Sequence, residues 1–294
     1  MTTHALSNNG MEISVITSNF NGERYLAEAV ESVLRQNYSS YEYIIVDDAS
    51  TDTSREIIQR YHQHHPNVIY PIFNTRNCGQ GRSFTSAVSA AKGHIVCFLD
   101  SDDYWFDDKL SRVNEIFSKQ PKVSIVQHNL QISINDQLTD TRFKDILITG
   151  DYFGYTKRNK VLPLFVPTTG LSFRRNVLQK VMPIPAVFRT CADGYLTRTC
   201  FCFGEVAALN ECLGVYRQHE KNNVFGNQAH SSRKYKKNIL FPSLNKFYTE
   251  NGIDLRFNSS IVNKIYENPP WKLLKNLISD RKFETVEKII SKFG

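Results

Sequence analysis

The amino-acid sequence predicts an α/β fold, with a mostly parallel sheet, flanking helices and a helical C-terminal extension. From Met11 onward, short apolar and β-branched runs alternate with segments that have the apolar period of a helix. This alternation is typical of parallel strands joined by helical crossovers. Two of the expected strands also end in clusters of carboxylates, at the edge where open sheets of this kind bind ligands.

Local patterns predict the individual elements. Apolar, β-branched runs predict strands at 13–17, 42–48, 67–73 and 94–100. Apolar residues at helical spacing predict one helix with Leu26, Val30, Val33 and Leu34, a second with Ile57, Ile58 and Tyr61, and others at 81–93 and 107–119. Farther along the chain we expect a strand at 123–134 and a strand running into a helix at 167–181, whereas 140–162 has no clear pattern.

The charge distribution divides the chain. The net charge is +7, but residues 221–294 hold 14 of the 36 Lys and Arg and only 6 of the 29 Asp and Glu. The first 220 residues therefore lack the basic bias of a nucleic-acid-binding domain, and no nucleic-acid partner is expected. We expect a polar N-terminal tail at 1–10, one large domain at 11–225 and a basic helical extension at 226–294.

Several features predict a cytoplasmic protein. The N-terminal residues lack the basic start and apolar core of a secretory signal, and no apolar run approaches the roughly 18 residues that span a bilayer. The six cysteines form no CxxC pair and are expected to be reduced. The run "HQHH" at 62–65 has no acidic companions and is interpreted as solvated.

Carboxylates gather where two strands end. Asp47 and Asp48 follow the second strand, and Asp100 and Asp102 follow the fourth, in "CFLDSDDYW". Mg²⁺ and Mn²⁺ take carboxylate oxygens and share their coordination with substrate phosphates, so this arrangement predicts a metal-diphosphate site. The alternative is an acidic cluster that caps the next helix.

Four motifs together carry a family resemblance. They are "VDDASTD", Asn74 spaced ahead of Gly79, "AKGHIVCFLDSDDYW", and "VYRQHEKN" at 215–222. In this order the chain resembles the family 2 inverting glycosyltransferases, which have the Rossmann-like GT-A fold, over about residues 11–222. The resemblance implies an enzyme that uses Mn²⁺ or Mg²⁺ and moves a sugar from a nucleotide-diphosphate donor, expected to be UDP-linked, to a hydroxyl of a glycan or lipid-linked acceptor. It also suggests cell-surface polysaccharide or lipopolysaccharide synthesis.

The resemblance also implies roles for particular residues. Thr17, Asn19 and Asp47 would hold the nucleobase, and Asp100 the ribose or the metal shell. Asp102 and His219 would ligate the metal. The small residues Thr168, Thr169 and Gly170 would lie beside the donor sugar, or would only start a strand.

Two further residues have open interpretations. Asp193 would accept the proton of the acceptor hydroxyl, or would only cap a helix, in which case Glu205 or Glu211 is the next candidate base. Trp105 would form an apolar wall for a sugar, or would anchor a helix in the core.

Other classes of protein fit less well. A haloacid-dehalogenase-type phosphatase carries its DxD on the first strand, whereas here it follows the fourth. A receiver domain needs a lysine that we do not find, and "CGQGRS" lacks the third glycine of a dinucleotide-binding motif. A non-catalytic nucleotide-sugar-binding protein remains the main alternative, against which Asp193 argues.

The extension should be helical, at 232–249, 259–267, 270–279 and 281–292. Its last two helices carry apolar stripes beside lysines, as in helices that lie on an anionic membrane surface. The alternatives are docking on the chain's own domain or on a second subunit in a homodimer.

Overall fold

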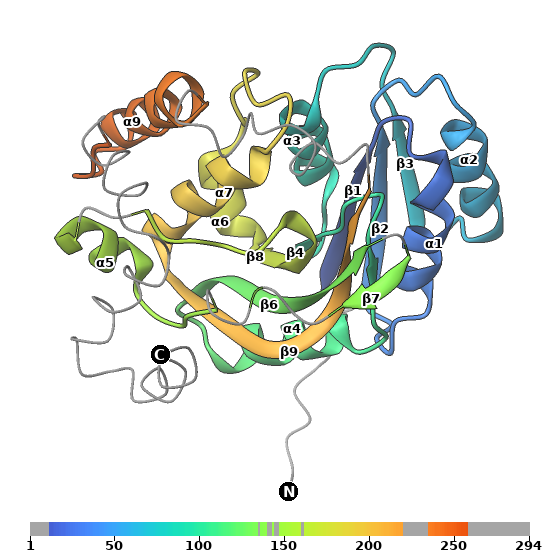
Figure 1. Ribbon diagram of the computed structural model, residues 1–294, viewed down its shortest axis with the longest axis horizontal. Coiled ribbons are helices and arrows are strands. Elements are labelled where there is room, and N and C mark those ends of the chain that lie inside the picture. Colours follow the sequence, from blue (N-terminus) through green and yellow to red (C-terminus); the bar gives the residue numbers. More distant parts are fainter. Residues whose placement is uncertain are drawn as a thin grey trace, which may run out of the picture.

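The computed structural model describes residues 12–134, 136–139, 143, 147–159, 162–219 and 235–257. These residues form a mixed sheet with the strand order β3-β2-β1-β4-β8-β6-β9-β5, and β7 pairs with β6 (Figure 1). The strands are β1 Ile13–Asn19, β2 Tyr41–Asp47, β3 Ile69–Phe73, β4 Ile95–Phe98, β5 Tyr104–Trp105, β6 Val123–Ile134, β7 Gln137–Thr139, β8 Leu171–Arg174 and β9 Glu205–Gln218. The helices are α1 Glu23–Leu34, α2 Ser54–His64, α3 Gln80–Ala90, α4 Lys109–Lys119, α5 Tyr152–Asn159, α6 Arg175–Val181, α7 Ala192–Cys200 and α9 Phe241–Glu250.

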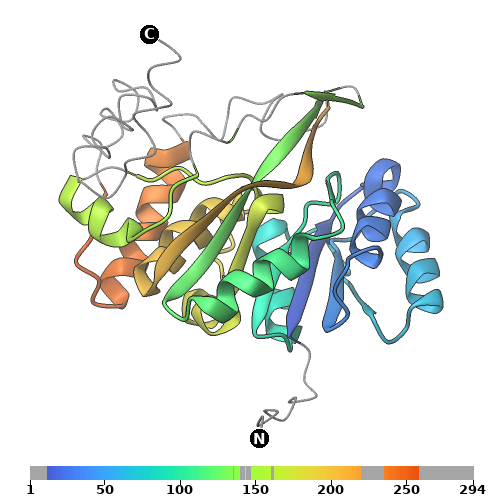
Figure 2. The ribbon, with the colours of Figure 1, turned by 90° about the horizontal axis from the view of Figure 1, so that it is seen from below.

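The first four strands are parallel, as the sequence predicts. β1 lies between β2 and β4, and β2 pairs with β3. Beyond β4 the sheet becomes mixed, because β8 runs antiparallel to both β4 and β6. The long strands β6 and β9 run parallel and side by side (Figure 2). β9 therefore carries residues 215–218 back toward the edge where β1 and β4 end.

The pleat of the parallel strands divides their side chains between two cores. Ile16 and Phe98 belong to the core beneath α3, α6 and α7. Val15 and Cys97, their neighbours in sequence, belong to the core beneath α1, α2 and α4. Helices therefore cover both faces of the sheet. For this reason the sequences of the parallel strands are continuous apolar runs.

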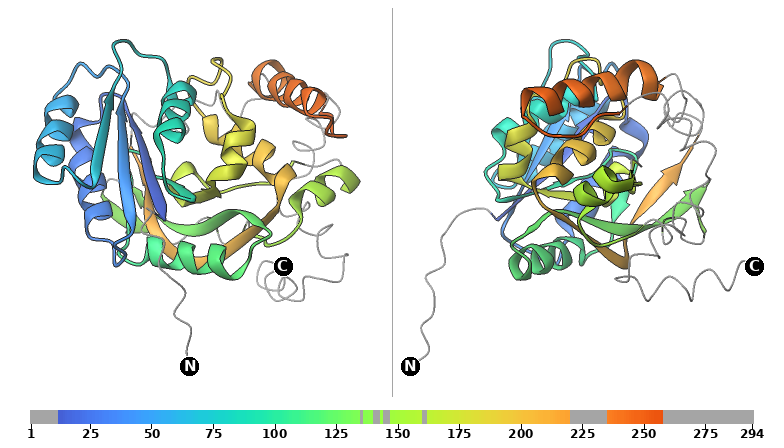
Figure 3. Two further views of the ribbon diagram at one scale, coloured as in Figure 1. Left: turned by 180° about the vertical axis from the view of Figure 1, so that it is seen from behind. Right: turned by 90° about the vertical axis from the view of Figure 1, so that its left-hand side faces the viewer.

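The described part of the C-terminal extension packs on α7. A π-helix, Lys236–Leu240, leads directly into α9, so the helix predicted at 232–249 is confirmed over its described part, 235–249, and ends one residue later, at Glu250. Leu244 and Tyr248 are fully buried in the same core as α7, on the opposite side of the sheet from α4 (Figure 3). The domain boundary at 225 stays a prediction.

Three of the predicted helices, at 259–267, 270–279 and 281–292, lie outside the described residues, and the membrane and homodimer hypotheses stay predictions with them. Within the residues that the structure does describe, no helix is long and apolar enough to cross a membrane.

Candidate active site

A cleft of about 1520 Å³ opens at the carboxyl ends of the parallel strands. Ligand pockets usually hold about 300 to 1000 Å³, so this cleft has room for two substrates. Five of the predicted site residues line it, namely Asp100, Asp102, Thr168, Asp193 and His219. They come from the loop after β4, the turn before β8, α7 and the position directly after β9.

Asp102 and His219 meet in the cleft, although they are far apart in the sequence. His219 Nε2 lies 3.0 Å from Asp102 Oδ2, and the imidazole packs against the ring of Tyr25, with 5.0 Å between ring centroids. The two residues that the resemblance assigns to the metal are thus adjacent.

Asp103 and Arg217 hold Asp102 and His219 next to each other. Asp103 is fully buried and accepts a hydrogen bond from the backbone N–H of Arg217 (2.7 Å) and another from the Thr169 hydroxyl. Arg217 in turn donates to the backbone carbonyl of Asp102 (2.7 Å) and pairs with Glu28 (2.7 Å). The loop after β4 is therefore tied to β9 two residues before His219.

Thr169, Gly170 and Trp105 support the site from within the core. Trp105 is 1% exposed, and its indole N–H donates to the carbonyl of Thr169 (2.9 Å). Gly170 is also buried, and a Cβ there would lie 2.6 Å from Val166 and 3.0 Å from the carbonyl of His128. The core interpretation of Trp105 fits these contacts, and none of the three lines the cleft.

The carboxylates of the cleft crowd one another. Burial, and then the negative charges of Asp102 and Asp193, raise the pKa of Asp100 well above its usual range, against the hydrogen bond from Thr168. Burial, and then the negative charges of Asp102 and Asp100, raise the pKa of Asp103 well above its usual range. A bound divalent cation would relieve this repulsion.

The residues fit a cation that takes most of its ligands from a substrate. In the part of the chain that the structure describes, no cluster of three His, Cys, Asp or Glu side chains could hold a metal by itself. Mg²⁺ is commonly held by one or two carboxylates plus substrate phosphates, and Asp102 with His219 supplies a protein side of that kind. The run "HQHH" lies at the end of α2, outside the cleft lining.

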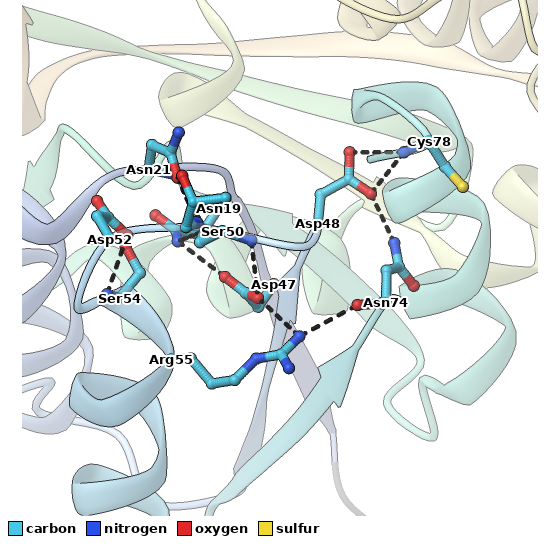
Figure 4. Close-up of polar contacts among 11 residues, drawn as sticks. Asn19, Asn21, Asp47, Asp48, Ser50, Asp52, Ser54, Arg55, Asn74 and Cys78 are labelled. Carbon is cyan, nitrogen blue, oxygen red and sulfur yellow. Dashed lines mark hydrogen bonds and ion pairs between the residues drawn. The ribbon is translucent and has the colours of Figure 1, made fainter. Parts of the chain in front are cut away.

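The structure separates the roles of Asp47 and Asp48 (Figure 4). Asp47 is fully buried, pairs with Arg55 (3.3 Å) and does not line the cleft. Asp48 does line it. Its carboxylate accepts hydrogen bonds from Asn74 Nδ2 (2.7 Å) and from the backbone N–H of Gly79 (2.6 Å). The sequence analysis assigned the nucleobase to Asp47, the first aspartate of the pair. In the structure, Asp48 is the one whose side chain reaches the cleft.

Thr17 and Asn19 also lie beneath the cleft surface. The Thr17 hydroxyl donates to the carbonyl of Leu99 (2.9 Å), and Asn19 Nδ2 donates to Asp47 (3.3 Å). Both residues are fully buried. They brace the ends of β1 and β2, and their contact with a nucleobase stays a prediction.

Asp193 lies in the first turn of α7 and is not its N-cap. That position belongs to Cys191, which has a left-handed backbone (φ 53°), and no side-chain cap bond is made there. Glu205 and Glu211 lie on β9 outside the cleft lining, and Glu211 pairs with Arg112 (2.7 Å). Of the three candidate bases, only Asp193 lines the cleft.

Four cations that line the cleft escaped the sequence analysis, namely Arg24, Arg189, Arg198 and Lys236. Arg198 lies on α7, and Lys236 lies in the C-terminal segment that packs on it; both line the cleft. No motif marks either residue, and Lys236 belongs to a tail whose position the sequence does not reveal.

Comparison with known proteins identifies the family. The model of glycosyl transferase family 2 matches residues 14–182. The chain belongs to this family. A relative, an uncharacterized glycosyltransferase of Nostoc sp. (strain PCC 7120), is 40% identical over 215 residues, which are 72% of this chain and 66% of that protein. The chain spans about two thirds or less of the length of the curated relatives it matches first.

Solved structures show the same fold. Staphylococcus aureus TarS (residues 1–349) with UDP-GlcNAc has a TM-score of 0.65 at 17% identity, covering 87% of this chain and 70% of that one. Its full name is poly(ribitol-phosphate) beta-N-acetylglucosaminyltransferase, and 96 residues are 34% identical, which are 32% of this chain and 17% of TarS. The Pyrobaculum calidifontis mannosyltransferase PcManGT with GDP-Man and Mn²⁺ has a TM-score of 0.59 at 17% identity, covering 91% and 73%. The predicted family and GT-A fold are thus confirmed.

Proposed function

We propose that this family 2 protein is a metal-dependent, inverting glycosyltransferase that moves a sugar from a UDP-linked donor to a hydroxyl of a glycan or lipid-linked acceptor. The observation that carries the proposal is the placement of Asp102, His219 and Asp193 around one cleft, with the first two 3.0 Å apart. The mannosyltransferase neighbour bound to Mn²⁺ supports the metal, and TarS bound to UDP-GlcNAc supports the donor class.

In this mechanism, Asp102 and His219 would hold the cation. When bound, the cation neutralises the charge that builds on the departing diphosphate. Arg217, fixed by Asp103, keeps His219 next to Asp102, and Thr168 donates to Asp100. These residues therefore bind and orient the leaving group.

Asp193 acts on the other substrate. The acceptor oxygen forms a bond to the anomeric carbon while the bond to the diphosphate oxygen breaks, and the hydroxyl proton passes to the Asp193 carboxylate. Attack opposite the leaving group inverts the anomeric centre. Because α7 carries Asp193 and the β4 loop carries Asp102, the base and the leaving-group site come from separate elements.

A donor panel tests the proposal. The purified chain is mixed with Mn²⁺ and UDP-, GDP- or dTDP-sugars, and thermal stabilisation and nucleotide release are measured. We expect UDP-sugars to raise the Tm and to be slowly hydrolysed, and EDTA to abolish both effects. Stabilisation without hydrolysis or transfer to any acceptor would favour a non-catalytic nucleotide-sugar-binding protein. No response to any nucleotide sugar would contradict the proposal.

A further inference from the structure

The end of the cleft beyond Asp193 differs in chemistry from the carboxylate end. Its lining includes the cations Arg198 and Lys236 and the apolar side chains of Phe165 and Leu240. The first cation comes from α7, and Lys236 and Leu240 come from the π-helix that precedes α9. The C-terminal segment therefore forms part of the cleft wall.

The Arg198 side chain is held in place by neutral groups. Its Nη1 donates to the carbonyl of Gly194 (3.1 Å), and its Nη2 to the carbonyl of Pro163 (3.3 Å). The guanidinium lies 5.8 Å from the centre of the Phe165 ring. Its Nε is buried and has no hydrogen-bond partner in the described part of the chain. These contacts fix the direction of the guanidinium, whose charge is also felt by the carboxylate of Asp193. With Lys236 included, the two cations outnumber this one carboxylate.

Lys236 reaches the cleft because its helix is anchored on α7. The Tyr235 hydroxyl donates to the carbonyl of Cys191 (3.4 Å), and the Tyr248 hydroxyl donates to the carbonyl of Arg198 (2.6 Å). Burial, and then the charge of Arg198, lower the pKa of the Lys236 amine to about 8. An anion bound near both cations would offset this repulsion.

We propose that Arg198 and Lys236 bind a phosphate group of the acceptor, next to Asp193. The assignment rests on the proposed function, since it takes the donor diphosphate to lie at Asp102 and His219. A guanidinium and an ammonium together match the charge and the several acceptor oxygens of a phosphate. The phosphate would hold the acceptor with a hydroxyl near Asp193, while Phe165 and Leu240 contact its uncharged part.

Matched variants test this assignment. Lys236→Gln is compared with Lys237→Gln, which changes an exposed lysine of the same helical turn. The acceptors are a glycerol phosphate oligomer, N-acetylglucosamine linked to farnesyl diphosphate, and glycerol as the uncharged control. We expect Lys236→Gln to raise KM about tenfold for at least one phosphate-bearing acceptor and to change KM for the donor less than twofold. Lys237→Gln should change neither, and the acceptor that responds identifies the source of the phosphate.

A labelling measurement decides the same question without turnover. Lys236 and Lys237 of the wild-type chain are acylated with an amine reagent at pH 8 and quantified in one digest. The glycerol phosphate oligomer or the farnesyl diphosphate conjugate should slow the labelling of Lys236 several-fold and leave Lys237 unchanged. Protection by UDP-GlcNAc with Mn²⁺ alone would overturn the assignment and give the cations to the donor, and protection by none of these ligands would also overturn it. Because this readout needs no catalysis, it still decides the point if the chain proves inactive.

Discussion

The two ends of the cleft are built in different ways. At the carboxylate end, Asp102 and His219 are held by the buried contacts of Asp103 and Arg217, which tie a loop after β4 to the end of β9. At the cationic end, Arg198 and Lys236 are brought together by the packing of the C-terminal segment on α7. The family match covers residues 14–182, which include the DxD loop but not Arg217, His219 or either cation.

This difference suggests a division of labour. A cation and a diphosphate are common to many donors, so the residues that hold them can be shared across a family. Acceptors differ more, and a wall supplied by a separate C-terminal segment can change without disturbing the sheet edge. On this view, loss of a carboxylate-end residue abolishes the chemistry, whereas loss of a cationic-end residue changes the choice of acceptor.

The largest effect is expected from Asp102→Asn. This change removes the charge that holds the cation, so metal-dependent nucleotide binding should be lost and transfer should fall about a thousandfold or more. His219→Ala should be a weaker form of the same defect, partly rescued by excess Mn²⁺. Calorimetry with UDP at several Mn²⁺ concentrations measures both, and wild-type affinity in Asp102→Asn would remove this residue from the metal site.

Asp193→Asn tests whether Asp193, which lies between the two ends of the cleft, is the general base. The amide keeps the shape of the side chain but cannot accept the acceptor proton, so transfer should fall by about two orders of magnitude or more while donor and Mn²⁺ still bind. Calorimetry and initial rates separate the two outcomes. If the variant transfers sugar at nearly the wild-type rate, the base must be sought elsewhere, although Glu205 and Glu211 lie outside the cleft lining.

Much of this arrangement could be predicted from the sequence. The strands β1 to β4 and the DxD loop follow from local apolar patterns and from carboxylates at strand ends, and the "YRQH" motif places His219. Local patterns predict the position of the site because the carboxyl ends of parallel strands meet at one edge of the sheet.

The remaining features depend on tertiary packing. The sequence does not tell whether Asp47 or Asp48 faces the cleft, because the chain leaves β2 between them and either carboxylate could turn inward. A tryptophan after a DxD loop could contact a sugar, but the indole N–H of Trp105 donates its hydrogen bond to the carbonyl of Thr169 inside the core. Lys236 reaches the site only because a distant segment docks on α7.

The pair Asp48→Asn and Asp47→Asn sharpens the description of the carboxylate end. The Asp48 carboxylate accepts two backbone N–H bonds, from Cys78 (2.9 Å) and Gly79 (2.6 Å), in a loop that borders the cleft. An amide cannot satisfy all of these donors, so nucleotide affinity should weaken by about 1.5 to 3 kcal/mol. Asp47→Asn should lower stability more than affinity. The reverse result, by calorimetry and urea unfolding, would support Asp47 as the base-binding residue.

The smallest expected effect concerns Lys109, which lies in the core behind the carboxylate end. Its amine is fully buried, donates to the Ser172 hydroxyl (3.2 Å) and lies 3.6 Å from the centre of the Trp105 ring. Burial lowers the pKa of Lys109 from 10.5 to about 8. Because the unfolded chain then binds more protons than the native chain between pH 8 and 10.5, this lysine should make stability rise with pH across that window.

Lys109→Met should abolish this rise. Between pH 7.5 and 9.5, the free energy of unfolding of the wild type should increase by about 2 kcal/mol more than that of Lys109→Met. Urea unfolding at both pH values measures the difference, and Lys122→Met, which changes an exposed lysine, should behave like the wild type. Parallel pH profiles for the wild type and Lys109→Met would mean that the buried amine is already neutral at pH 7.5 or stays charged throughout. If the amine is neutral, Trp105 is supported by packing alone; if it stays charged, Ser172 and the Trp105 ring hold a buried cation behind the carboxylate end.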